Sequence, residues 1–195
     1  MDAVRFWDDH YREPRTTGVN PVLAEIAADL PAGRALDLGC GAGGDALWLA
    51  ARGWRVTAVD ISANAVARLA EHARDLPVSA VRADLGAEFP EGEFDLVSAQ
   101  YFHTPFELPR ARVLRTAAHA LRPGGRLVVV DHGSVAPWSW NTEGDFPTPE
   151  EVFAELALDA GWRAERADAP RRVATGPGGQ TATVTDHVLV VRRAA

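Results

Sequence analysis

Short apolar runs, rich in β-branched residues, alternate with longer helical patterns along most of this chain. Such alternation is typical of a parallel sheet whose strands are joined by helices. The runs predict buried strands at 34–39, 54–60, 78–84, 94–100 and 125–132. Helices are expected between them at about 45–52, 62–76 and 110–122, with Ser62 as an N-cap and the Pro/Gly run 122–125 as a stop signal.

The C-terminal part departs from this alternation. After a helix near 149–160, two further strands are expected at 162–168 and 181–193, joined by a link that includes the turn-rich segment 175–180. Strands joined without a helix favour an antiparallel pair at the edge of a sheet. We therefore expect a Rossmann-like α/β fold, with seven mostly parallel strands, helices on both faces, right-handed crossovers and one antiparallel edge strand.

Length and composition favour one domain. The 195 residues contain 47% hydrophobic residues and no internal repeat, which is enough apolar material for one core spanning 1–195. Within it we expect an N-terminal helical lid at 1–32 and a cofactor-binding half at 33–132. Residues 133–195 then supply a loop on the substrate side, a helix and the terminal hairpin.

Charge and cysteine content narrow the range of partners. The formal net charge of -7 and the lack of clustered Lys and Arg argue against nucleic acid. No apolar run approaches the roughly 20 residues that span a bilayer, and the charged N-terminus does not resemble a signal peptide. With Cys40 as the only cysteine, an intrachain disulfide is impossible. We expect a cytoplasmic monomer or homodimer that acts on a small molecule.

The segment "LDLGCGAGG" at 36–44 satisfies two cofactor signatures at once. It fits the G-x-G-x-x-G loop of dinucleotide enzymes and the D-x-G-x-G-x-G loop of methyltransferases. Asp60 ends the second strand, where either cofactor needs a carboxylate for its ribose, so it does not discriminate. Asp37 does, because a carboxylate there would repel a pyrophosphate yet suits a cationic amino group. Asp84, in "RADL", is placed to accept from an adenine amine.

Taken in order, "LDLGCGAGG", "VTAVDIS", "RADL", "FDLVSAQ" and "LRPGGRLVVV" resemble the motifs of class I S-adenosylmethionine-dependent methyltransferases, over about residues 33–193. The resemblance implies S-adenosyl-L-methionine as methyl donor and S-adenosyl-L-homocysteine as product. The cofactor-binding residues that it implies are Asp37, Gly39, Cys40, Gly41, Asp60, Ile61, Asp84, Leu85 and Gln100. An NAD- or FAD-dependent oxidoreductase and a non-catalytic cofactor-binding module remain alternatives.

The resemblance also implies what each residue does. Asp37 would hold the amino end of the cofactor, and Asp60 would bind both ribose hydroxyls. Ile61 would pack on the adenine, residues 84–85 would recognise its edge, and the backbone of Gln100 would lie under the sulfonium. Cys40 belongs to the loop as a small packing residue rather than as a nucleophile.

Candidates for acceptor chemistry follow the fourth and fifth strands. Tyr101, His103, Asp131 and His132 are expected at the carboxyl ends of adjacent strands, where open α/β sheets bind ligands, and Tyr11 is expected to face them. His103 could deprotonate a thiol or hydroxyl, or only line the pocket. Asp131 could orient either histidine, and a structural or substrate-contact role is favoured for His132. The six histidines show no metal-ligand spacing, so no metal is expected.

Two segments are expected to cover this edge. Residues 4–13 predict an amphipathic helix, and 134–151 form a long loop that carries Trp138, Trp140 and Phe146. Loops this long are usually functional or disordered, and exposed aromatic side chains are costly. We interpret them as lids over an apolar acceptor, with packing on the domain's own flank as the alternative.

The acceptor itself is indicated by a narrower resemblance. "SAQYFHTPFE" lacks the Asn/Asp-Pro-Pro-Tyr/Phe motif of the family's amide and adenine N-methylating members, which disfavours that chemistry. "FWDDHYRE", "AQYFH" and "FPTPEE" are similar to small bacterial methyltransferases of the tellurite-resistance and thiopurine type, which methylate soft nucleophiles. This favours a thiol or another soft nucleophile, with O- or N-methylation of a small metabolite or natural product as the alternative.

Overall fold

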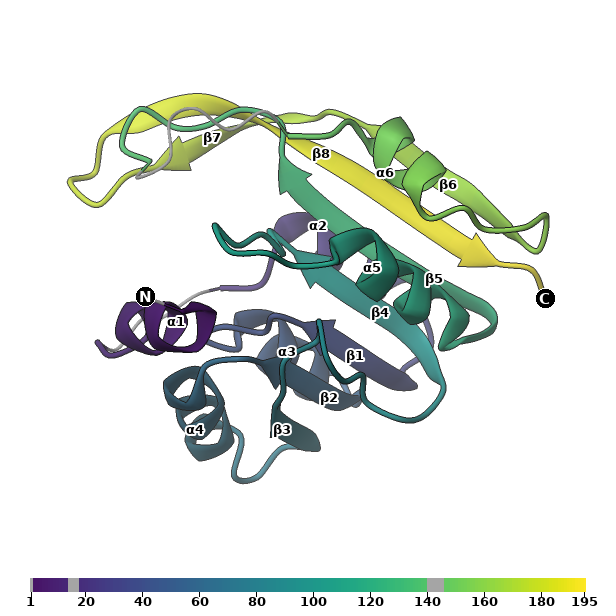
Figure 1. Cartoon of the computed structure of the whole chain (residues 1–195), viewed down its shortest axis with the longest axis horizontal. Helices are drawn as coiled ribbons and strands as arrows, with labels where there is room; N and C mark the ends of the chain where they lie inside the picture. Colours follow the sequence, from purple (N-terminus) through teal and green to yellow (C-terminus); the bar gives the residue numbers. More distant parts are fainter. Residues whose placement is uncertain (1, 14–17, 140–145) are drawn as a thin grey trace.

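The computed structural model of the chain describes residues 2–13, 18–139 and 146–195, which form a sheet between two layers of helices (Figure 1). The strands are β1 (Arg34–Leu38), β2 (Arg55–Asp60), β3 (Val78–Arg82), β4 (Phe94–Gln100), β5 (Leu121–His132), β6 (Trp162–Asp168), β7 (Arg171–Thr175) and β8 (Thr181–Arg193). The helices are α1 (Ala3–His10), α2 (Pro21–Ala28), α3 (Gly44–Ala50), α4 (Ala63–His72), α5 (Arg110–His119) and α6 (Pro149–Glu155). In this part of the chain, no helix is long and apolar enough to cross a membrane.

The sheet has the order β3-β2-β1-β4-β5-β8-β6, with β7 paired to β8. Strands β1 to β5 run parallel, and β8 runs antiparallel to each of its neighbours. The expected α/β class and the parallel majority are confirmed. The expected count of seven strands is wrong, because the described residues form eight.

The reversed strand is also not the edge strand that we expected. Strand β8 lies between β5 and β6, and β6 takes the edge. The physical reason is burial: the apolar run 188–191 in β8 is buried, whereas β6 carries charged and mostly exposed residues. An apolar strand is better placed where both of its neighbours cover it.

Strand β7 lies in the link that the sequence analysis assigned no structure. It forms a hairpin with the first half of β8, closed by a hydrogen bond from the Gly176 N–H to the Gln180 carbonyl at 2.7 Å. Its residues alternate between exposed and half-buried, as in a two-stranded ribbon that extends beyond the core. In Figure 1 this hairpin arches past the end of the sheet on the side where α1 lies.

Alternation along the strands divides the core into two layers. In β5, Leu127 and Val129 pack with the residues of α5 and α6, whereas Val128 and Val130 pack with those of α2, α3 and α4. Successive side chains of a strand point to opposite faces, so a strand covered on both sides must be apolar throughout. This explains why β5 reads as a continuous apolar run.

The helix ends follow local signals with one exception. Ser62 caps α4 as expected, accepting a hydrogen bond from the Ala65 N–H at 3.2 Å. Helix α5 ends at His119, earlier than expected, and the Pro/Gly run 122–125 lies inside β5. Phe94 of β4 pairs with Leu121 of β5, and Leu96 pairs with Arg126. The Pro/Gly run therefore lies in an irregular part of β5, where the register of the two strands shifts.

The strand order reverses between β1 and β4, so the loops that follow these two strands diverge to opposite faces of the sheet. A crevice at this point, at the carboxyl ends of the strands, is the usual ligand site of open α/β sheets. The fold therefore directs attention to the residues just after Leu38 and Gln100.

Two glycines in left-handed conformations test how tightly this fold is packed. Gly43 (φ +83°) caps α3, and a Cβ there would collide with the Leu69 side chain; at Gly53 (φ +87°) a Cβ would lie 3.7 Å from Ala32 Cβ. We expect Gly53→Ala to cost about 1–2 kcal/mol of backbone strain. Gly43→Ala should lose the same amount to backbone strain and about 1–3 kcal/mol more to overpacking against Leu69. Urea unfolding measures the free energy of unfolding of both variants. Equal losses for the two variants would contradict this packing.

Candidate active site

A cavity of about 170 Å³ opens at the carboxyl ends of β1 and β4, where the strand order reverses. The residues proposed from sequence that line it are Tyr11, Gly39, Asp60, Ile61, Asp84, Leu85, Gln100, Tyr101 and His103. Seven further residues complete the lining: Ala3, Trp7, Ala83, Phe102, Thr104, Glu107 and Leu108. The remaining candidates, which do not line the cavity, are Asp37, Cys40, Gly41, Asp131 and His132. The structure thus gathers candidates for cofactor and acceptor chemistry around one space.

The glycine loop passes so close to its neighbours that side chains do not fit. Gly39 and Gly41 have φ angles of +66° and +51°. A Cβ on Gly39 would lie 2.8 Å from a ring carbon of Phe102, and one on Gly41 would meet the Tyr11 hydroxyl. Glycine is required at both positions, because it alone combines this conformation with this approach. The loop is therefore a backbone cradle between the end of β1 and the residues that follow α1 and β4.

Asp60 ties this loop to the end of β2. Its carboxylate accepts hydrogen bonds from the N–H groups of Gly41 and Ser62, both at 2.9 Å. The side chain is buried, and this burial raises its pKa. Each carboxylate oxygen can accept a second hydrogen bond, so Asp60 can hold the loop and still bind a hydroxyl in the cavity.

Asp37 is the least compensated charge in this region. It is 2% exposed, and its Oδ2 finds no hydrogen-bond partner among the described residues. Burial raises the pKa of Asp37 well above its usual value, and the nearby carboxylates of Asp45 and Asp60 raise it further. Burial also raises the pKa of Asp45 to about 6. A buried carboxylate of this kind is stabilised by a cation.

This electrostatic setting distinguishes the two cofactors that the glycine loop allows. Among the residues that the structure describes, the cavity lining includes Asp60, Asp84 and Glu107 but no Lys or Arg. A pyrophosphate would add negative charge to an already acidic site, whereas a cationic amino group would compensate Asp37. The residues present fit the methionine end of S-adenosylmethionine.

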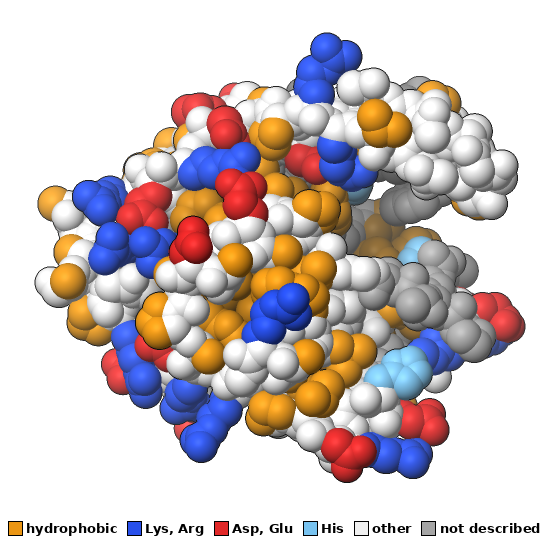
Figure 2. All heavy atoms as spheres, turned by 180° about the vertical axis from the view of Figure 1, so that it is seen from behind, with side chains coloured by type: hydrophobic (Ala, Val, Ile, Leu, Met, Phe, Trp, Pro, Cys, Tyr) orange, Lys and Arg blue, Asp and Glu red, His pale blue; other side chains and the backbone are white. Residues whose placement is uncertain are grey.

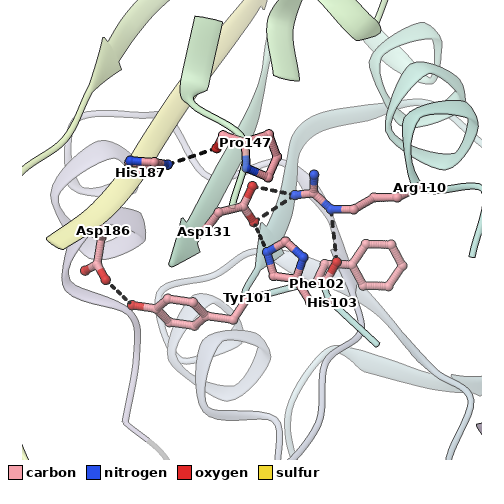
Figure 3. A network of polar contacts seen from close by, with 8 residues as sticks. All are labelled: Tyr101, Phe102, His103, Arg110, Asp131, Pro147, Asp186 and His187. Atoms are coloured by element: carbon pink, nitrogen blue, oxygen red, sulfur yellow. Dashed lines mark hydrogen bonds and ion pairs between the residues drawn. The ribbon is translucent and has the colours of Figure 1, made fainter. Parts of the chain in front are cut away.

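His103, Asp131 and Arg110 form a charged network beside the cavity (Figure 3). His103 Nε2 lies 2.9 Å from Asp131 Oδ1, although this contact is not aligned as a hydrogen bond, and Arg110 Nη2 donates to both oxygens of Asp131 at 2.7 and 2.6 Å. Burial alone would raise the pKa of Asp131, but the close contact with His103 and the positive charge of Arg110 lower it. Of the two histidines that Asp131 could orient, the contact is with His103, whose side chain is 25% exposed.

Tyr101 and His132 form a second cluster behind the first. The Tyr101 hydroxyl donates to Asp186 and accepts from Arg172, both at 3.0 Å, and burial raises the pKa of Tyr101 to about 12. The ring stacks on His132 with centroids 4.4 Å apart, and burial lowers the pKa of His132. A hydroxyl with this pKa and two partners is a poor base at neutral pH. These contacts favour a structural role for both rings.

The expected lids contact the site from two directions. On α1, the Trp7 indole donates to the Thr104 hydroxyl at 3.2 Å, and Asp8 accepts from the Ser62 hydroxyl at 2.8 Å. Phe146 lies with its ring centroid 5.3 Å from those of His103 and His132.

The other aromatic residues of the 134–151 loop do not all join this lid. Trp138 lies instead beside Gly176 in the turn of the β7–β8 hairpin, and Trp140 falls outside the described residues. Figure 2 shows the molecule from behind, hollowed between this hairpin and the N-terminal elements, with histidine visible in the hollow.

Several residues of the site gave no signal in the sequence. Arg110 and Arg172 are ordinary arginines in the chain, and only the fold brings them to Asp131 and Asp186. Phe102 and Thr104 could have been found, because they flank the predicted candidate His103. Among the residues that the structure describes, no group of three His, Cys, Asp or Glu side chains could hold a metal ion.

Comparisons with known proteins agree with this geometry. Residues 35–125 match the family described as "Methyltransferase domain". A ribosomal RNA small subunit methyltransferase C from Chromohalobacter salexigens is 36% identical over 77% of this chain and 45% of its own length. A 27-O-demethylrifamycin SV methyltransferase from Amycolatopsis mediterranei is 35% identical over 79% of this chain and 60% of its own length. A probable thiol methyltransferase from Arabidopsis thaliana is 35% identical over 56% of this chain and 52% of its own length.

Solved structures extend the likeness to nearly the whole chain. A protein studied for the conversion of a disulfide bond into a thioacetal group during echinomycin biosynthesis has a TM-score of 0.73 and 26% identity, covering 98% of this chain and 93% of its own. TehB from Haemophilus influenzae has a TM-score of 0.73 at 19% identity, covering 96% and 67%, and shows a shared fold alone. The chain spans only 45% to 60% of the length of the sequence relatives named above.

The uncompensated charge of Asp37 leads to a prediction in which stability and binding change in opposite directions. We expect Asp37→Asn to stabilise the ligand-free protein at pH 7 by about 1–2 kcal/mol, because a buried charge is removed. The same change should weaken S-adenosylmethionine binding at least about tenfold, because a charge-assisted contact to the amino group is lost. Urea unfolding and calorimetry measure the two effects, with the exposed Asp29→Asn as control.

The stability gained by Asp37→Asn should depend on pH in a definite direction. Because the pKa of Asp37 is raised on folding, the wild-type protein binds a proton more tightly when folded, and its stability falls as pH rises above the unfolded pKa of about 4. The gain from Asp37→Asn should therefore be absent below about pH 4 and grow as pH rises. A gain that is independent of pH would contradict the assignment.

Proposed function

We propose that this chain, which contains a class I S-adenosylmethionine-dependent methyltransferase domain, transfers the methyl group to a small-molecule acceptor, with a thiol or another soft nucleophile favoured. The observation that carries the proposal is one cavity whose lining includes Gly39 of the glycine cradle, Asp60 and His103. The unpartnered carboxylate oxygen of Asp37, close to that cradle, adds the site for a cationic amino group.

The donor side would use four groups of this chain. Asp37 would hold the amino group and Asp60 the ribose hydroxyls, while Gly39 leaves room for the cofactor to approach the backbone. The Asp84 carboxylate already accepts from the Gly86 N–H at 2.8 Å, and it would also accept from an adenine amine. When bound, S-adenosylmethionine supplies an electrophilic methyl group on a sulfonium.

On the acceptor side, the protein has to align a nucleophile and exclude water, because methyl transfer is an in-line displacement. His103 lines the cavity and is backed by the buried carboxylate of Asp131. In this arrangement His103 would accept the proton of the acceptor, and Asp131 would stabilise the imidazolium that results. Trp7 and Phe146 would cover the two sides of the reacting groups.

A thiol fits this site with the least additional machinery. An alkanethiol resembles the Cys side chain, with a pKa of about 8.5, and a phenol resembles Tyr, with a pKa of about 10. A histidine base therefore removes the proton of a thiol more readily than that of a phenol. The probable thiol methyltransferase among the relatives supports this choice, as does the structure concerned with a disulfide and a thioacetal.

O-methylation of a small metabolite or natural product is the second candidate. The 27-O-demethylrifamycin SV methyltransferase supports it, and the same His103–Asp131 pair could deprotonate a phenol. N-methylation is a weaker candidate, because it would make no comparable use of a base such as His103. One relative is a ribosomal RNA methyltransferase, which would support a nucleic acid acceptor. The net negative charge of this chain argues against that acceptor.

Removing Asp60 tests the donor side. We expect Asp60→Ala to weaken S-adenosylmethionine binding by about tenfold or more, because it removes both the hydroxyl contacts and the anchor of the glycine loop. Calorimetric titration of S-adenosylmethionine, and separately of NAD and FAD, measures this. Unchanged affinity for S-adenosylmethionine, or tight binding of a dinucleotide instead, would overturn the assignment.

Removing His103 tests the acceptor side. With methyl-labelled cofactor and three acceptors, 2-phenylethanethiol, phenol and benzylamine, we expect turnover of the thiol first. His103→Gln should lower kcat about 100-fold while leaving cofactor affinity unchanged, because a general base contributes on this order. Methylation confined to phenol would overturn the thiol preference. Tight cofactor binding with no methylation of any of these acceptors would favour a non-catalytic module.

A further inference from the structure

Arg110, the first residue of α5, connects two parts of the site that are otherwise separate. Its Nη2 donates to both carboxylate oxygens of Asp131, and its Nε donates to the backbone carbonyl of Phe102 at 3.0 Å. The side chain is 16% exposed and does not line the cavity. One guanidinium thus contacts the end of β5 and the loop that follows β4 (Figure 3).

The second of these contacts matters because of where His103 lies. His103 follows Phe102 in the 101–109 loop between β4 and α5, which has no helix or strand of its own. The Arg110–Phe102 hydrogen bond fixes the backbone immediately before His103, and the Arg110–Asp131 pair fixes the group that His103 contacts. Both partners of the His103–Asp131 contact therefore depend on the same side chain.

We propose that Arg110 is a positioning residue, which holds Asp131 against Nε2 of His103 and leaves Nδ1 of that ring to take the acceptor's proton. The inference rests on the proposed function for the role of His103 as base. A carboxylate oxygen 2.9 Å from Nε2 favours the tautomer that carries the proton on that nitrogen, which leaves a lone pair on Nδ1. Arg110 would act through Asp131 and would touch neither cofactor nor acceptor.

An arginine suits this task in a way that a lysine does not. The planar guanidinium donates in several fixed directions, so it can serve a carboxylate and a carbonyl on different elements at once. A lysine supplies the charge from one point at the end of a flexible chain. The charge of Arg110 and its geometry can therefore be separated by substitution.

Other titratable groups lie near His103 or line the same cavity, among them Tyr11, Asp60, Asp84 and Tyr101. His132 lies with its ring centroid 6.4 Å from that of His103. Asp186 on β8 and Arg172 on β7 are paired with each other at 2.6 Å. Glu107 lines the same cavity from the 101–109 loop. Asp131 and Arg110 therefore form the buried charge pair in direct reach of His103.

The test compares Arg110→Gln and Arg110→Lys with a matched control, Arg115→Gln. Arg115 lies on the same helix but donates to the carbonyls of Leu156 and Glu155, on the far side from the site. Nitrogen-15 NMR of histidine-labelled protein reports which ring nitrogen of His103 carries the proton, and His103→Gln identifies the signals. This measurement needs neither cofactor nor acceptor.

In the wild type and in Arg115→Gln, we expect His103 to show one dominant neutral tautomer with the proton on Nε2. In Arg110→Gln the two nitrogens should move toward averaged shifts, as in a free imidazole, with cofactor affinity changed less than about twofold. Tautomer signals in Arg110→Gln identical to those of the wild type would overturn the proposal, and so would a wild-type proton on Nδ1.

Kinetics with 2-phenylethanethiol and phenol give the second readout. In Arg110→Gln we expect kcat to fall about 10- to 100-fold, as is typical when the partner of a functional histidine is lost. Arg110→Lys should restore only part of the rate, because it keeps the charge but not the fixed geometry of the guanidinium.

The two arms separate failure of this inference from failure of the proposed function. A kcat and a His103 tautomer in Arg110→Gln equal to those of Arg115→Gln would overturn the positioning role while leaving methyl transfer intact. Absence of turnover by the wild type, together with an Nε2-protonated His103 that depends on Arg110, would overturn the proposed function and support the positioning role.

Discussion

The site is organised by the burial of carboxylates at and beside the carboxyl edge of the central sheet. Asp37, Asp60, Asp131 and Asp186 are all at most 7% exposed. An ionised carboxylate removed from water is costly unless hydrogen bonds or a cation replace the solvent. Three of the four are compensated within the chain: Asp60 by backbone N–H groups, Asp131 by Arg110, and Asp186 by Arg172. Asp37 retains an oxygen without a partner among the described residues, next to the loop where a cationic ligand would bind.

These compensating contacts also connect the segments around His103. Arg110 joins the loop after β4 to the end of β5, and Arg172 joins the β7–β8 hairpin to Tyr101 at the end of β4. Each ion pair therefore fixes a segment that the parallel sheet alone would leave free. Breaking either pair would leave a buried charge, which is more destabilising than the intact pair is stabilising. The position of His103 consequently depends on electrostatics as much as on packing.

The sequence predicted best what depends on neighbouring residues. Most strand bounds between 34 and 100, the Ser62 cap and the expected position of Asp60 follow from local alternation and turn chemistry. The interior position of β8 and the existence of β7 depend on pairings between distant segments, which no local pattern encodes. Arg110 could not be found for the same reason, since its partner Asp131 lies 21 residues further along the chain. The cavity gathers most of the sequence candidates, but their individual roles remain predictions.

The packed core fixes the position of Asp131, whereas the segments around His103 lie outside the parallel strands. Asp131 belongs to β5, which is covered by helices on both faces, so the carboxylate behind His103 is set by the most tightly packed part of the fold. The surroundings of His103 include residues of α1 and of the 101–109 loop in the cavity lining, together with Phe146, and none of these belongs to a strand of the parallel sheet. Substitutions in these segments would change the shape of the cavity while leaving Asp131 and the glycine cradle in place. A rigid sheet edge surrounded by loops and a terminal helix is how one fold comes to serve different ligands, because the core and the cavity walls can change independently.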